Sequence, residues 1–312
     1  MRREGSPWQG LGVVTLKELS DHLSSVRMRV LELLVVLTTG AALYGAILHV
    51  RASTAEDLFL YLRLFTTAYE PLPSFASFLA FLIPILAIGL GFDAINGEHS
   101  RRTLSRILSQ PIYRDALLFG KFIAGLLTLS ISLIAMWLLV IGLGLLLLGV
   151  PPNAEEMARV TIFLLVTIAY AGVWLALAML FSIVFRSAAS AALITLGLWL
   201  FLTMIWPALA PAIAIAIVPS EDQGTLVSAA QMLSRLSPST LFIEVVAAIL
   251  NPATRSLGPI YLSQMQGAIP GAPLPLTESL IIAWPQIVGL VAGAILLFVV
   301  GYIVFQRQEV RA

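Results

Sequence analysis

Cysteine is absent from this chain of 312 residues, and charged residues are scarce. Without cysteine the protein has no disulfide bond, no thiolate metal site and no cysteine nucleophile. Asp, Glu, Lys and Arg make up 11% of the sequence, whereas hydrophobic residues make up 59%. The mean hydropathy of +0.96 is far above the range of soluble globular proteins. The composition therefore predicts an integral membrane protein.

The sequence also lacks the motifs of an enzyme that hydrolyses nucleotides or peptides. The nearest match to the phosphate-binding pattern G-x-x-x-x-G-K-[ST] is at Lys121, but Asp115 replaces its first glycine and Phe122 replaces its Ser or Thr. No H-E-x-x-H motif occurs, and the three histidines are too scattered to predict a metal site. We expect this chain to be no enzyme by itself and to bind no cofactor.

An ion relay is missing as well. Transporters that couple to protons or sodium usually need ionisable groups at membrane depth, where these groups bind the ion. Glu32 is one turn into the first apolar run, His49 is at its outer end, and Asp93 follows the second run. We expect all three to be interfacial residues whose polar ends reach toward water. Spans so poor in charge indicate a lipid-like or amphipathic cargo.

The sequence does contain six apolar runs long enough to span a membrane. About twenty helical residues cross a hydrocarbon core of roughly 30 Å. The expected spans are residues 30–50, 75–91, 122–148, 160–185, 191–209 and 285–305. The predicted fold is therefore all-α, with six transmembrane helices in a single transmembrane domain.

An even number of spans places both termini on the same side of the membrane. Of the 18 Lys and Arg residues, five fall on the other side, which leaves 13 on the side of the termini. These five are Arg51, Arg63, Arg159, Arg235 and Arg255. Because basic residues are enriched in cytoplasmic loops, we expect a multi-pass protein of the plasma membrane with both termini in the cytoplasm.

A charged, amphipathic segment at residues 15–29 precedes the first span, in place of the apolar core of a signal peptide. Leucines recur in it at spacings of three and four, opposite Lys17, Glu18 and Arg27. This pattern predicts an elbow helix that lies in the cytoplasmic interface and leads into the first span. An ordinary solvated helix is the alternative.

The longest connection on the outer side covers residues 210–284. We expect it to contain a helix through Arg235 and a second one at residues 241–250, which is too short to cross the membrane and contains Glu244. This second helix is predicted to be re-entrant or to lie on the surface. In the last span, Gly289 and Gly293 form a G-x-x-x-G face, which serves internal helix packing or a seam between two subunits.

A single long charged insert, residues 92–121, separates two apolar runs. It has room for a short amphipathic helix at residues 100–109, which Pro111 ends. The apolar side of this helix carries Leu104, Ile107 and Leu108, and its basic side carries Arg101, Arg102 and Arg106. The insert is therefore predicted to be a rigid, basic loop on the cytoplasmic side.

Several residues of this insert match a known pattern. They are Gly97-Glu98, Thr103-Leu104, Leu108, Gln110-Pro111, Arg114 and Gly120-Lys121. With them, the insert resembles the first cytoplasmic loop of ABC-2-type transporter permeases, the family that includes NosY-like permeases and exporters of drugs or polysaccharides. Arg102 stands where that family usually has glycine. The elbow segment, the six spans and a terminal Phe305-x-Arg307-x-Glu309 extend the resemblance over nearly the whole chain.

The resemblance implies the membrane subunit of an ABC-2-type exporter. Two such subunits, identical or different, are then expected to pair, and each contacts a separate ATPase subunit that binds ATP and Mg²⁺. Membrane lipid is a further expected partner, and nucleic acid is not. The residues implied in coupling to the ATPase are Glu98, Arg101, Arg102, Leu104, Arg106, Ile107, Leu108 and Arg114.

Two other functions remain open from the sequence. A non-transporting membrane anchor or assembly factor could use the same basic insert to recruit a cytoplasmic partner. A secondary transporter or channel would instead need a water-lined polar path, which these spans do not supply.

Overall fold

The computed structural model describes residues 8, 10–52, 59–100, 113–218, 223–258 and 273–308. Within these residues the protein consists of helices and their connections, without β-strands. Six helical segments are long and apolar enough to cross a membrane, which confirms the predicted all-α, six-span fold. They are Val26–Val50, Phe75–Glu98, Arg114–Leu148, Ala154–Val184, Ala188–Ile217 and Leu276–Arg307.

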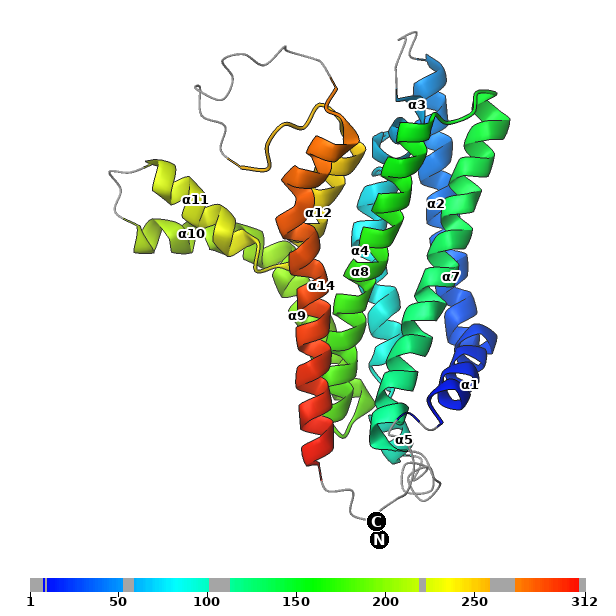
Figure 1. Ribbon diagram of the computed structural model, residues 1–312, viewed down its shortest axis with the longest axis vertical. Helices are drawn as coiled ribbons and strands as arrows, with labels where there is room; N and C mark the ends of the chain where they lie inside the picture. The colour runs from blue at the N-terminus through cyan, green and yellow to red at the C-terminus, as the bar shows by residue number, and fades with distance from the viewer. Residues whose placement is uncertain are drawn as a thin grey trace.

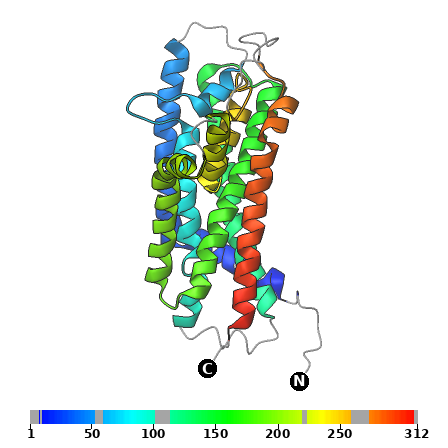
Figure 2. The same cartoon turned by 90° about the vertical axis from the view of Figure 1, so that its left-hand side faces the viewer.

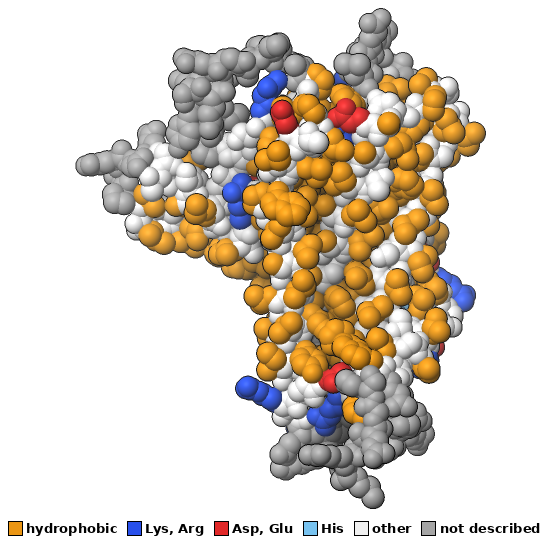
Figure 3. Space-filling model, in the orientation of Figure 1, with side chains coloured by type: hydrophobic (Ala, Val, Ile, Leu, Met, Phe, Trp, Pro, Cys, Tyr) orange, Lys and Arg blue, Asp and Glu red, His pale blue; other side chains and the backbone are white. Residues whose placement is uncertain are grey.

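The long helices run side by side in one bundle (Figure 1). They are α2 (Val26–Ala52), α4 (Phe75–Gly91), α7 (Arg114–Leu148), α8 (Ala154–Val184), α9 (Ala188–Leu200) and α14 (Leu276–Arg307). The central helix is α8, which packs against α4, α7, α9 and α14 and is buried along most of its length. Hydrophobic side chains cover the middle of the face in Figure 3, and most of its charged side chains lie toward the two ends. Such a surface suits contact with lipid chains.

A separate helix, α1 (Leu11–Ser24), lies across one end of the bundle and packs against the beginning of α7 (Figure 1). We call this end the α1 end. The elbow helix was predicted at residues 15–29, but it starts at Leu11 and stops at Ser24, so that Arg27 belongs to α2. Ser25 separates the two helices because its backbone is extended and its Oγ accepts a hydrogen bond from the Met28 amide at 3.1 Å.

Several spans are longer as helices than their apolar runs. α7 begins eight residues before the predicted 122–148 span, and α14 begins at Leu276, ahead of Pro285. α8 begins at Ala154, where Asn153 and Glu156 form a reciprocal capping box. Hydropathy marks the part of a helix that lies in hydrocarbon, whereas its capping residues mark where the helix begins. The predicted 75–91 span coincides with α4.

The fifth span does not end near residue 209 as predicted. α9 continues through a short π-helix, η1 (Phe201–Ile205), into α10 (Trp206–Ile217). α10 turns away from the bundle, and α11 (Gln223–Ser234) returns beside it, so that the pair forms a lateral arm (Figures 1 and 2). The wide π turn and Pro207 at the start of α10 account for the change of direction.

At the end of the arm, α12 (Pro238–Leu250) enters the bundle at 109° to the end of α11. Phe242, Val245 and Ile249 are buried, and α12 packs mainly against α8 and α14. The apolar side of α12 therefore faces protein, and the predicted alternative of a surface helix at 241–250 stays a prediction. A re-entrant segment stays a prediction that is compatible with the sharp bend. Two short helices, α3 (Leu60–Thr66) and α5 (Asn96–Ser100), complete the described elements.

Candidate coupling site at the α1 end

Most residues expected to couple this chain to an ATPase fall outside the described residues. These are Arg101, Arg102, Leu104, Arg106, Ile107 and Leu108, all within the segment 101–112. The chain on either side of that segment is described: Glu98 lies in α5, and Arg114 is the first residue of α7. The structure therefore defines how the two ends of the predicted coupling segment are held.

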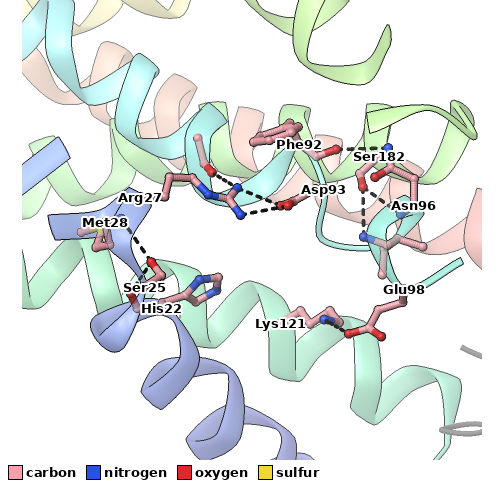
Figure 4. Close-up of polar contacts among 12 residues, drawn as sticks. His22, Ser25, Arg27, Met28, Phe92, Asp93, Asn96, Glu98, Lys121 and Ser182 are labelled. Atoms are coloured by element: carbon pink, nitrogen blue, oxygen red, sulfur yellow. Dashed lines mark hydrogen bonds and ion pairs between the residues drawn. The ribbon is translucent and has the colours of Figure 1, made fainter. Parts of the chain in front are cut away.

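A polar cavity of about 440 Å³ lies between α1, α7, the start of α2 and the segment that follows α4. Ionisable side chains from all four places line it, and Figure 4 shows several of them pointing toward one another. They are Lys17, Glu18, Asp21, His22, Arg27, Asp93, Glu98 and Lys121. The predicted elbow residues Lys17, Glu18 and Arg27 are thus brought together with Glu98.

Lys121 joins three elements in this cavity. Its ammonium nitrogen lies 3.0 Å from Glu18 Oε1 on α1 and 3.3 Å from Glu98 Oε1 on α5 (Figure 4 shows the second contact). The lysine side chain is 5% exposed, and the two glutamates are 11% and 17% exposed. Since a buried ammonium group needs a paired carboxylate, Lys121 binds α1 and α5 to α7 at the entrance of the coupling segment.

A second ion pair ties α2 to the turn after α4. The guanidinium of Arg27 donates to both carboxylate oxygens of Asp93, at 3.1 and 2.9 Å, and to the Gly89 carbonyl at 2.8 Å (Figure 4). It also lies 5.1 Å from the centre of the Phe92 ring. Asp93 was expected to be an interfacial residue that reaches toward water, whereas it forms a bidentate pair with α2.

The same turn is anchored to the end of α8. The backbone amides of Ile95 and Asn96 donate to Ser182 Oγ at 3.0 and 3.2 Å, and the Asn96 side chain donates to the Phe185 carbonyl at 3.3 Å. Ser182 is buried within the core of the bundle. Sequence reasoning missed this contact, since a lone serine in an apolar helix gives no sign of a partner 86 residues away.

The far side of the coupling segment is held by the end of α14. Arg114 donates to the Gln308 carbonyl at 2.9 Å, and the Gln308 side chain donates to the Ile183 carbonyl at 2.8 Å. Gln306 also donates to the carboxylate of Asp115. α14, α7 and α8 are therefore connected where the segment 101–112 rejoins the bundle.

His22 is the one histidine among the side chains that line this cavity. Burial in α1 lowers the pKa of its imidazole. Glu18 and Asp93 act in the opposite direction, whereas Lys121 and Arg27 reinforce the lowering. The neutral form of His22 is thus favoured in the folded protein.

The glycines of the predicted G-x-x-x-G face lie far from this site and contact other helices of the same chain. A Cβ atom on Gly289 would lie 3.2 Å from Leu241 of α12, and one on Gly293 would lie 4.0 Å from Val173 of α8. These distances support internal packing, which was one of the two predicted roles. A role in a seam between subunits stays a prediction.

The elements at the α1 end are held together by ion pairs and hydrogen bonds. Arg27 pairs with Asp93 and Lys121 pairs with Glu18 and Glu98 across elements, whereas Lys17 pairs with Glu18 and Asp21 within α1. In the described segments, no group of three His, Asp or Glu side chains could hold a metal ion. The turn after α4 is thus joined to α2 through Arg27 and to α8 through Ser182, and the start of α7 is joined to its neighbours through Lys121 and Arg114.

Comparison with known proteins gives this arrangement a family. Residues 13–310 match the family model described as ABC-2 family transporter protein. The chain is 30% identical over 274 residues to the probable ABC transporter permease protein NosY of Pseudomonas aeruginosa, a match that covers 86% of each chain. It is 31% identical over 195 residues to the protein of the same name from Stutzerimonas stutzeri, over 62% of this chain and 66% of that one. The chain therefore belongs to the ABC-2 family of transporter proteins and is a permease subunit of an ABC transporter.

Proposed function

We propose that this permease is the membrane subunit of an exporter that a separate ATPase subunit drives. In this proposal the ATPase binds ATP and Mg²⁺ and docks on the segment 101–112. A second permease subunit, identical or different, pairs with this one in the plasma membrane. The α1 end faces the cytoplasm, in keeping with 13 of the 18 Lys and Arg residues falling on the side of the termini.

The observation that carries the proposal is the position of Lys121 at the entrance of the coupling segment. Its contacts with Glu18 and Glu98 link the chain just before this segment to both α1 and α7. A docked ATPase that moved the segment would therefore push on the helices themselves, because no slack loop lies between Glu98 and the bundle. Such a rigid connection is required if a separate ATPase subunit is to move the membrane helices.

The basic side of the helix predicted at residues 100–109 would fit a partner with an acidic groove. Arg101, Arg102 and Arg106 offer charge for orientation, and the leucines and isoleucine of the opposite side offer apolar anchors for the groove. Charge complementarity of this kind sets the rate and register of docking more than its affinity.

The test is the double charge reversal Arg102→Glu with Arg106→Glu in the complete transporter. We expect the ATPase to copurify at least about tenfold less well, since reversed charges meet the same acidic rim and tenfold corresponds to roughly 1.4 kcal/mol. The matched control is the reversal of Arg2 with Arg3, two arginines on the same expected side, which should leave copurification unchanged.

The outcome of this experiment also separates the alternatives. Full copurification and transport in the Arg102/Arg106 variant would refute docking at this segment. Copurification of an ATPase by the unchanged chain without any ATP-dependent transport in vesicles would instead favour the anchor or assembly factor.

A further inference from the structure

An apolar cavity of about 230 Å³ lies between α2, α4 and α7, inside the bundle and separate from the polar cavity at the α1 end. Its wall includes Val35, Ile83, Leu86 and Met136. Among the described residues, two polar side chains line it, Glu32 from α2 and Ser132 from α7. We call it the Glu32 cavity.

Glu32, predicted to be an interfacial residue, forms a side-chain hydrogen bond with a neighbouring helix. α2 begins at Val26, so Glu32 is nearly two turns inside the helix, and its Oε1 accepts a hydrogen bond from Ser132 Oγ at 2.9 Å. In the described part of the chain, no Lys, Arg or His side chain forms an ion pair with it. One hydrogen bond leaves most of the acceptor capacity of a carboxylate unused.

The Glu32 cavity opens between α2 and α7. Val36 of α2 and Ile131 of α7 line it and are 43% and 45% exposed, and Ala135 of α7 is exposed as well. These residues belong to candidate membrane spans, so the opening faces the lipid side of the bundle. A molecule dissolved in the membrane can therefore reach the cavity without passing through the polar cavity at the α1 end.

The size and charge of the Glu32 cavity define an occupant. An apolar cavity of roughly 150 Å³ stays dry and takes up a benzene-sized group, so this larger one accommodates a phenyl ring or a short alkyl segment. A carboxylate in an apolar wall is stabilised by a cation, since the attraction between opposite charges grows as the surroundings become less polar. We propose that the Glu32 cavity binds an amphipathic organic cation, with its ammonium group at Glu32 and its apolar group between α2, α4 and α7.

This inference does not depend on the ATPase, because it concerns binding of the cation to the permease alone. The test uses the purified full chain in lipid nanodiscs and radiolabelled phenylbutyltrimethylammonium as the probe. Its neutral carbon isostere, with tert-butyl in place of trimethylammonium, is measured in parallel. We expect saturable binding of the cation that exceeds binding of the isostere.

Two variants with matched controls locate the site. Glu32→Gln keeps the hydrogen-bond acceptor for Ser132 and should weaken binding of the cation about tenfold while leaving the isostere unchanged. Glu278→Gln, at an exposed glutamate in the first turn of α14, should change neither. Ala135→Phe narrows the opening and should reduce binding of both probes, whereas Leu138→Phe, at a position that does not line the cavity, should not.

The proposal is overturned if Glu32→Gln binds the cation as well as the unchanged chain, or if the unchanged chain shows no preference for the cation over its isostere. Should Glu32→Gln fail to fold, Ala135→Phe decides in the same way, since retained saturable binding in that variant also excludes the cavity. A failure of the ATPase to copurify with the unchanged chain would count against the proposed function but not against this inference, because binding of the cation is measured on the permease alone.

Discussion

At the scale of single residues, Lys121 is the side chain on which the α1 end depends most directly. Its side chain is 5% exposed, and its ammonium group lies between carboxylates of α1 and α5. Exposed ion pairs contribute little to stability, because water and salt screen them. Here burial removes that screening, so the cost of losing one partner is the cost of leaving the others unpaired.

Replacing Lys121 by Met should therefore destabilise the protein by about 3 kcal/mol, because the buried ammonium group that pairs with both Glu18 and Glu98 would be lost. Thermal unfolding of the purified chain in detergent measures the effect. ATPase copurification should fall in parallel, since the entrance of the coupling segment loses its attachment to α7.

Lys17→Met is the matched control for this lysine. Lys17 contacts the same Glu18 oxygen at 3.0 Å, but its side chain is 57% exposed. Its removal should cost less than about 1 kcal/mol. Equal effects of the two substitutions would show that burial is not what makes Lys121 important.

At the scale of elements, α1 is an amphipathic helix whose polar side faces the protein. Leu16 and Leu23 are 70% and 40% exposed, whereas Glu18 is buried against Lys121. The leucines suit contact with lipid, and the polar side lines the cavity at the α1 end. The docking of α1 therefore depends on charged and titratable groups, among which is His22, whose pKa burial lowers from its ordinary value.

Acidification should loosen α1. Because burial lowers the pKa of His22, the unfolded or undocked chain binds more protons than the docked one once the pH falls below about 6.5. Stability of the docked helix is thus fully present above that pH and decreases as the pH falls toward the lowered pKa. Hydrogen exchange of α1 at about pH 7.5 and about pH 5.5 measures this loss.

His22→Gln should abolish most of that pH dependence. The control, His49→Gln, removes an exposed histidine of α2 and should preserve it. A pH response that survives in His22→Gln would assign it to the carboxylates of the cavity instead.

Elements also show what the sequence could and could not predict. Runs of apolar residues located all six crossings, because the thickness of the membrane sets their length. The helix through Arg235 was predicted, but the lateral direction of α10 and α11 was missed, since α10 is as apolar as the span that it follows and only the π turn and Pro207 redirect it. The polar contacts of Ser182 and the pairing of Asp93 with Arg27 could not be predicted either, because both join residues distant in sequence.

At the scale of the whole molecule, α8 is the axis that connects the two ends of the bundle. Ser182 holds the turn after α4 at the α1 end. At the opposite end, the guanidinium of Arg159 is fully buried and donates to Glu155, to Ser279 Oγ and to the carbonyls of Ile249 and Leu274. One planar side chain thus connects α8 with the end of α12 and the start of α14.

Arg159→Met should release this opposite end without disturbing the α1 end. The variant leaves two buried carbonyls and Glu155 without their donor, at a cost of about 3 kcal/mol, and Arg159→Lys should rescue little because an ammonium group cannot reproduce the planar fork. Hydrogen exchange should therefore rise in α12 and the first turns of α14, while α1 and α5 keep their protection. Arg186→Met, at an exposed arginine beyond the other end of α8, is the matched control and should change neither region. If the loss of Arg159 also increased exchange in α1, the two ends would be coupled through α8, and the bundle would transmit motion along its central helix instead of through α4 and α7.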